Sequence, residues 1–97
     1  MKIEMARKKP LVVRTVVWDG HAHTANRFIG ERYGTDWEYE EQDGQSIKIW
    51  NSKEECWVRC PLQHRIVEGV HGEFYPCEPA VFADSYDVTE VIEVTDE

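Results

Sequence analysis

The stretch Gly69-Val70-His71-Gly72-Glu73-Phe74-Tyr75-Pro76-Cys77-Glu78-Pro79, followed by Phe82 and Tyr86, says most about how this chain folds. Runs of apolar and β-branched residues at 65–70 and 73–76 flank His71-Gly72. Glycine at the second central position of a turn permits a positive φ, so the pattern predicts a β-hairpin with a two-residue loop. Pro76 has no amide hydrogen for a ladder, which places the second strand at an edge or ends it there. Pro79 can open a short helix in which Phe82 and Tyr86 share a face.

The residue pattern of the earlier part of the chain also predicts short elements separated by turns. A Val-rich run at 11–18 predicts a strand, central in its sheet because both faces are apolar. A short helix is expected next, with Thr24 as its N-cap and Gly30 at its end. Alternating residues at 37–40 and 46–50 around Asp43-Gly44 predict a second hairpin. Further strands are expected at 55–60 and 88–94. The sequence therefore predicts an α+β fold, with a small, mostly antiparallel β-sheet and one or two short helices.

Length and composition predict one soluble domain. The chain has 97 residues, so we expect residues 1–97 to form a single domain, with 1–9 as a flexible basic tail and 95–97 as a flexible acidic end. Hydrophobic content is 41% and charged content 31%, which is ordinary for a globular domain. No apolar run approaches the roughly 20 residues of a membrane helix. The charged start lacks the apolar segment of a signal peptide, which indicates a cytoplasmic protein.

The charge is strongly and unevenly negative. The net charge is −8, and because residues 1–14 carry +4, the remainder carries −12. Residues 78–97 contain seven acids and no lysine or arginine. Such a surface repels phosphate backbones, so direct nucleic-acid binding is disfavoured. We interpret the basic start as a solvated terminus rather than a phosphate-binding arm.

Several of these motifs resemble a family of small bacteriophage and prophage proteins. The shared features are a Val-rich strand between Arg7-Lys8-Lys9-Pro10 and Trp18-Asp19-Gly20, and the later run from Ile66 to Cys77 with Phe82 and Tyr86. The family's Gly-Asp-Tyr before that run is Gln63-His64-Arg65 here. The resemblance implies a phage-encoded accessory protein that acts in the host cytoplasm. It implies no activity and no catalytic residues.

No motif in the sequence predicts catalysis or a bound metal. Cys56, Cys60 and Cys77 are an odd number, which argues against a disulfide framework, and we interpret them as reduced, buried thiols. Cys56 and Cys60 would share a strand face instead of forming the compact knuckle of a zinc site. There is no glycine-rich phosphate loop and no recognisable nucleophile motif. We therefore predict no metal, no cofactor and no enzymatic activity.

The aromatic content favours an interaction module. Four tryptophans, Trp18, Trp37, Trp50 and Trp57, are many for a small domain, and we expect some of them to reach the surface. Exposed tryptophan and tyrosine are enriched at protein interfaces. The first hypothesis is a non-catalytic module that binds a host or phage protein. Exposed strand edges also make a homodimer plausible.

The alternative hypothesis is a small-ligand protein that binds a molecule of the nucleotide type. Such a site needs an aromatic ring to stack the base and cations to hold the phosphates. Residues near one another in the sequence supply both, and they form the predicted binding set: Trp57, Arg59, Arg65, His71 and Tyr75.

Overall fold

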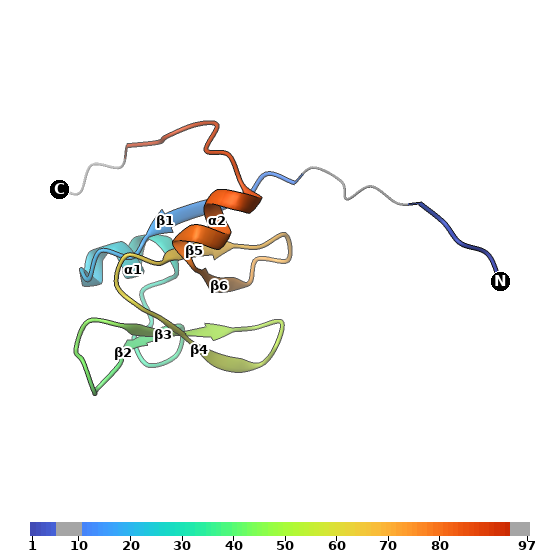
Figure 1. The fold of residues 1–97 in the computed structure, drawn as a ribbon. Coiled ribbons are helices and arrows are strands. Elements are labelled where there is room, and N and C mark those ends of the chain that lie inside the picture. The colour runs from blue at the N-terminus through green and yellow to red at the C-terminus, as the bar shows by residue number, and fades with distance from the viewer. Residues whose placement is uncertain (6–10, 94–97) are drawn as a thin grey trace.

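The computed structural model describes residues 1–5 and 11–93 and confirms a small α+β fold (Figure 1). Within those residues the chain forms six strands and two short helices. The predicted tail at 1–9 lies partly outside the described residues, and the predicted acidic end at 95–97 lies wholly outside them. In chain order the elements are β1 (Arg14–Val17), α1 (Ala22–Phe28), β2 (Trp37–Tyr39), β3 (Ile47–Asn51), β4 (Cys56–Cys60), β5 (Arg65–Glu68), β6 (Phe74–Cys77) and α2 (Pro79–Ser85).

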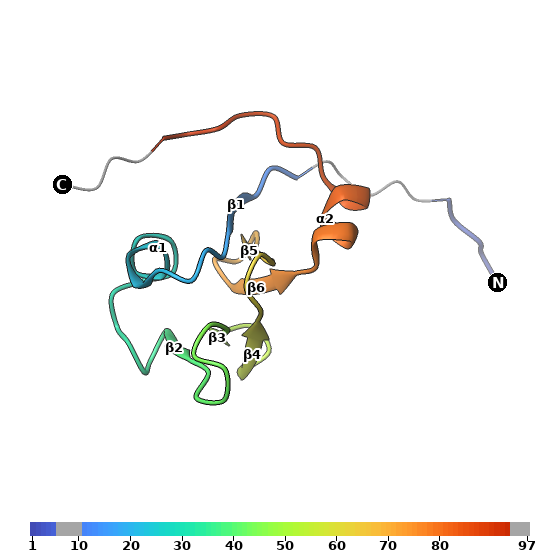
Figure 2. The ribbon, with the colours of Figure 1, turned by 60° about the vertical axis from the view of Figure 1, so that its left-hand side comes forward.

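The strands form two three-stranded antiparallel sheets, drawn one above the other in Figure 1. Sheet A has the order β1-β5-β6, and sheet B has the order β2-β3-β4. Strand β6 packs against β3 and β4, so the two sheets meet along that side. Helix α2 lies beside sheet A on the side away from sheet B, and α1 lies at one end (Figures 1 and 2).

The core lies between the two sheets and is built around two tryptophans. Trp18 and Trp37 are almost fully buried, with ring centroids 6.4 Å apart. Each indole nitrogen is satisfied: Trp18 Nε1 donates to the Gln45 carbonyl, and Trp37 Nε1 donates to the Gly30 carbonyl. Because buried indoles need such partners, the loop carbonyls fix where the tryptophans sit. The buried cluster around them also contains Ala25, Ile47, Ile49, Cys60 and Ile66.

Strand β1 differs from its prediction in length and position. It covers Arg14–Val17 instead of 11–18, and it is an edge strand paired only with β5. Its Val-rich composition nevertheless has a physical reason, because Val16 packs into the core while Thr15 and Val17 lie on the opposite, half-buried face. An edge strand can therefore carry two apolar faces when both are covered.

Helix α1 begins earlier than expected. Its N-cap is His21, not Thr24, and its C-cap is Ile29, with Gly30 following at φ +155°. The carboxylate of Asp19 accepts hydrogen bonds from the His21 amide and the Thr24 hydroxyl. The helix starts before Thr24 because the Asp19 side chain already supplies the acceptor that a capping threonine would provide.

The β5–β6 hairpin exists, but its loop is one residue longer than predicted. Glu68 pairs with Phe74, and the Gly69 amide donates to the Glu73 carbonyl, which leaves residues 70–72 as the loop. Gly72 has φ +78°, as expected, and closes a three-residue loop of the common glycine-bulge type. The Glu73 carboxylate is buried and accepts the His71 amide, and this contact favours the longer loop.

The end of the chain confirms one prediction and contradicts another. Pro79 opens α2, and the rings of Phe82 and Tyr86 stack at 5.1 Å. Pro76 lies in β6 at the sheet edge, as expected. The strand predicted at 88–94 is absent from the described part, since residues 88–93 form no ladder and are exposed. Alternating apolar residues do not form a strand without a partner strand.

Candidate functional site

The structure separates the five predicted binding residues into two pairs and a single residue. Trp57 and Arg59 lie on the same face of β4, two residues apart. Arg65 and Tyr75 lie on the face of sheet A that α2 covers. His71 is exposed in the loop between β5 and β6. Residues that are close in the sequence are therefore divided between two sheets and a loop, because the strands that carry them present different faces.

Trp57 pairs with a second tryptophan that the predicted site omitted. Trp50 of β3 is directly opposite Trp57 in the ladder, and the rings meet edge to face with centroids 5.5 Å apart. Both lie on the face of sheet B opposite the buried Ile47 and Ile49, which we call the outer face. Trp57 is 38% exposed and Trp50 is half-buried. The alternation at 46–50 and the register of the β3–β4 hairpin could have identified Trp50 as the neighbour of Trp57 on the outer face.

A row of charged side chains crosses the outer face beside the two tryptophans. Lys48 is opposite both Glu38 and Arg59 in the ladders, and its ammonium contacts the Glu38 carboxylate at 2.9 Å. The hydrogen bond that Lys48 donates to the Glu38 carboxylate raises the pKa of Lys48, and the charges of Glu38, Glu40 and Glu41 add to this effect against that of burial. The outer face therefore combines the tryptophan pair with paired charges. It is bordered by Glu38, Glu40 and Glu41, which we call the acidic margin.

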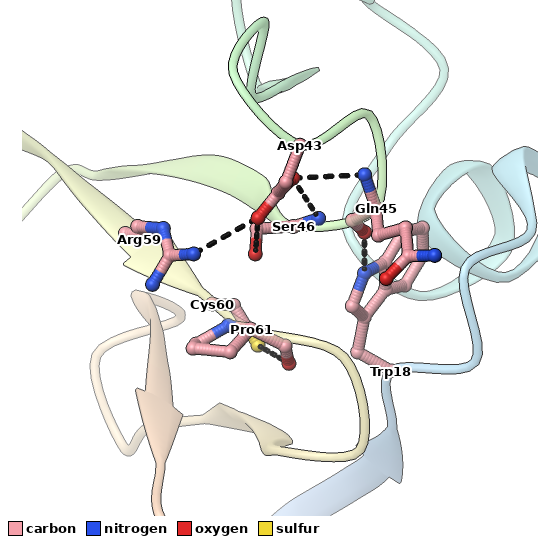
Figure 3. Close-up of polar contacts among 7 residues, drawn as sticks. All are labelled: Trp18, Asp43, Gln45, Ser46, Arg59, Cys60 and Pro61. Carbon is pink, nitrogen blue, oxygen red and sulfur yellow. Dashed lines mark hydrogen bonds and ion pairs between the residues drawn. The ribbon is translucent and has the colours of Figure 1, made fainter.

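Asp43 fixes the loop that borders this face (Figure 3). Its carboxylate accepts the backbone amides of Gln45 and Ser46 at 2.9 and 2.8 Å and the Ser46 hydroxyl at 2.8 Å. Arg59 donates to the same carboxylate at 2.9 Å. The backbone hydrogen bonds, then the Ser46 hydroxyl and Arg59, hold the pKa of Asp43 well below its ordinary value. Arg59 is thus held in position at the end of the row.

The depressed pKa of Asp43 predicts a specific loss of stability in acid. A carboxylate with a lowered folded-state pKa stabilises the fold above its unfolded-state pKa, near 3.8, and loses that contribution as the pH falls toward the folded-state pKa. We expect Asp43→Asn to lower the unfolding temperature by a few degrees at pH 7. The gap in unfolding temperature between the variant and the unmodified protein is expected to narrow below pH 4. Thermal unfolding followed by circular dichroism between pH 2 and pH 7 measures this gap. Asp84→Asn, an exposed aspartate of α2, is the control, and a gap independent of pH would contradict the assignment.

Arg65 and Tyr75 have structural roles at the α2 side of sheet A. The Arg65 guanidinium lies 4.4 Å from the centroid of the Phe82 ring. Burial, followed by a hydrogen bond with Tyr86, raises the pKa of the Tyr75 phenol. These contacts attach α2 to the sheet. The sequence motif that runs from Gly72 to Tyr86 is therefore explained by a hairpin and its covering helix.

The cysteines are free, but they differ in burial. Cys60 is fully buried, Cys77 is half-buried and Cys56 is exposed, so the expectation of three buried thiols is wrong for Cys56. Cys56 begins β4 directly after the 52–55 turn, beyond the end of the core. Burial raises the pKa of Cys60 to about 12, which makes that thiol a poor nucleophile. Within residues 1–5 and 11–93, no group of three histidine, cysteine or acidic side chains is placed to hold a metal ion.

Comparisons with known proteins show no relative. No protein-family model matches the chain, and no curated protein or solved structure matches it either. Among the described residues, no helix has the length and apolar character needed to cross a bilayer.

Proposed function

We propose that this protein is a non-catalytic interaction module that binds a host or phage protein through the outer face of sheet B. The observation that carries the proposal is the Trp50–Trp57 pair, which places two large aromatic rings side by side on an accessible strand face. Tryptophan is the residue most enriched among those that dominate binding energies at protein interfaces. The resemblance to phage proteins supports the phage setting of this role.

The charges around the pair indicate the kind of partner. Glu38 lies on the outer face, and Glu40 and Glu41 follow it in the loop after β2. With a net charge of −8, this margin favours a partner that presents an apolar patch ringed by basic side chains. Single-stranded nucleic acid could also stack on tryptophans, but the same charge opposes it.

Neutralising the acidic margin is expected to weaken partner binding. We expect Glu38→Gln, Glu40→Gln and Glu41→Gln together to reduce affinity roughly tenfold and to flatten its dependence on salt, because rim charges steer association. The tagged protein first captures its partner from a lysate of the bacterial host, and affinity for the purified partner is then measured at several salt concentrations.

A matched variant separates the local effect from net charge. Glu78→Gln, Glu90→Gln and Glu93→Gln make the same charge change at exposed positions outside sheet B. That variant is expected to bind as the unmodified protein does. If the outer-face variant bound its partner undiminished, or if both variants were weakened equally, the acidic margin would have no specific role in partner binding.

A homodimer built by strand pairing remains a separate prediction. The end strands of the two sheets, β1 and β6 in sheet A and β2 and β4 in sheet B, are the edges through which copies could pair.

A further inference from the structure

The free edge of β4 runs beside the tryptophan pair and is open to another strand. In the described part of the chain, β4 has β3 as its only ladder partner. Strand β6 contacts β3 as well as β4, so it lies against the sheet rather than along this edge. Trp57 is 38% exposed and Arg59 is exposed, which leaves the middle of the edge accessible to solvent.

Two backbone hydrogen bonds on the other side of β3 fix the directions of the peptide groups in sheet B. The Trp50 amide donates to the Asp36 carbonyl at 3.0 Å, and the Glu40 amide donates to the Ser46 carbonyl at 2.8 Å. The peptide groups of Ser46 and Trp50 therefore point toward β2. Because this direction alternates along an antiparallel strand, those of Ile49 point toward β4.

The register carries this alternation across to β4. Ile49 is opposite Val58, so these two residues form a hydrogen-bonded pair, whereas Trp50 and Trp57 are opposite each other without mutual backbone hydrogen bonds. The N–H and C=O groups of Trp57 and Arg59 consequently face away from β3. The open edge thus offers backbone donors and acceptors at the spacing of a regular strand, directly beside the Trp57 ring.

The same alternation shows that two other sheet edges are less suited to pairing. In sheet A, the Gly69 amide donates to the Glu73 carbonyl, so the outward-facing positions of β6 include Pro76, which has no amide hydrogen. The edge of β2 is partly used within the chain, because the Gly34 amide donates to the Trp37 carbonyl. Features of this kind block edge pairing, and nothing comparable in the part of the chain that the structure describes covers the middle of β4.

We propose that the partner adds an extended segment to the open edge of β4, as a fourth strand of sheet B, with an apolar side chain of that segment beside Trp57. This mode of binding rests on the proposed function and specifies how the partner is held. Backbone hydrogen bonds to a strand edge give affinity, and alternate side chains of the added segment give specificity. The net charge of −8 favours a basic or uncharged segment over a second copy of this chain.

Amide hydrogen exchange followed by NMR tests strand addition. In the free protein, the Trp57 and Arg59 amides are expected to exchange quickly, while the Val58 amide, which faces β3, exchanges slowly. The captured and purified partner is then added at saturating concentration, followed in a second titration by the tightest-binding of the peptides that tile its sequence. Both are expected to slow exchange of the Trp57 and Arg59 amides by about tenfold or more and to leave that of Val58 slow.

Arg59→Pro removes one outward-facing donor without removing a ladder hydrogen bond. Pro76 shows that an edge strand of this protein accepts proline at an outward-facing position. Arg59→Ala is the matched control, because both variants lose the contact with Asp43 and only the proline variant loses the amide. We expect Arg59→Pro to bind the partner about tenfold or more weakly than Arg59→Ala, since a carbonyl of the added segment is left without its donor. Circular dichroism checks that both variants are folded, and amide exchange of the unmodified protein decides the question if the proline variant is not.

Failure of strand addition is distinguishable from failure of the proposed function. If the partner shifts the Trp50 and Trp57 indole signals while the Trp57 and Arg59 amides still exchange quickly, the outer face binds through side chains alone and strand addition is refuted. Equal affinity of folded Arg59→Pro and Arg59→Ala would refute it as well. Protection of the two amides that rises with protein concentration in the absence of partner would assign the edge to a second copy and overturn the proposal. If no partner is captured, or if the partner moves none of these signals, the proposed function fails and strand addition fails with it.

Discussion

Replacement of Trp18 by alanine is expected to leave much of the protein unfolded at room temperature. Trp18 is fully buried and its ring contacts those of Trp37 and Tyr39, both from sheet B, so it joins the two sheets. Truncation of a buried aromatic residue to alanine costs about 3–5 kcal/mol, because the cavity is only partly filled by relaxation. A domain has about 5–15 kcal/mol of stability in total, and small domains lie toward the low end.

The hydrogen bond of the Trp18 indole adds to that loss. Trp18 Nε1 donates to the Gln45 carbonyl at 2.7 Å, and Gln45 lies in the loop that Asp43 fixes (Figure 3). Trp18→Phe retains most of the apolar volume but removes this donor, so we expect it to cost about 1–3 kcal/mol. Urea unfolding followed by far-ultraviolet circular dichroism measures both variants.

Trp57→Ala is the matched control for stability. Trp57 is 38% exposed on the outer face of sheet B, and we expect its truncation to cost about 1 kcal/mol. If Trp18→Ala unfolded at the same urea concentration as Trp57→Ala, the central role of Trp18 in the core would be refuted.

The second large effect is expected in binding rather than in folding. Simultaneous replacement of Trp50 and Trp57 by serine is expected to reduce affinity for the partner by a factor of about 100 or more. Interface tryptophans commonly contribute at least about 2 kcal/mol each when truncated, and neighbouring ones act together. Surface plasmon resonance with the captured, purified partner measures the change, and circular dichroism confirms that the variant is folded.

Val81→Ser is the control for that experiment. Val81 is a 51% exposed apolar residue on α2, away from the outer face of sheet B. Its replacement removes exposed apolar surface outside sheet B and is expected to leave affinity unchanged. A double tryptophan variant that binds the partner normally would remove the outer face from consideration as the interface.

Much of the local structure could be predicted because local residues determine it. Gly72 and Pro79 have conformational preferences that set a loop and a helix start, and both behave as expected. The loop length was missed because it depends on the buried carboxylate of Glu73, whose position a linear pattern does not reveal. The strand predicted at 88–94 failed for a related reason, since its alternation has no partner in the described part of the chain.

The candidate sites depend more heavily on tertiary structure. Trp57 and Arg59 were found together because alternation within one strand puts them on one face. The contacts of Arg65 with Phe82 and of Tyr75 with Tyr86 depend on the position of α2, which the sequence pattern does not reveal.

The central claim is that the partner binds the outer face of sheet B, and the four tryptophan indole N–H signals test it most directly. Trp18 and Trp37 are buried with hydrogen-bonded indoles, whereas Trp50 and Trp57 form the surface pair. Titration of ¹⁵N-labelled protein with the purified partner, with each signal assigned by a tryptophan-to-phenylalanine variant, separates the two sets. Our account predicts that the Trp50 and Trp57 signals shift or broaden while those of Trp18 and Trp37 stay in place. Unchanged Trp50 and Trp57 signals at saturating partner would contradict it.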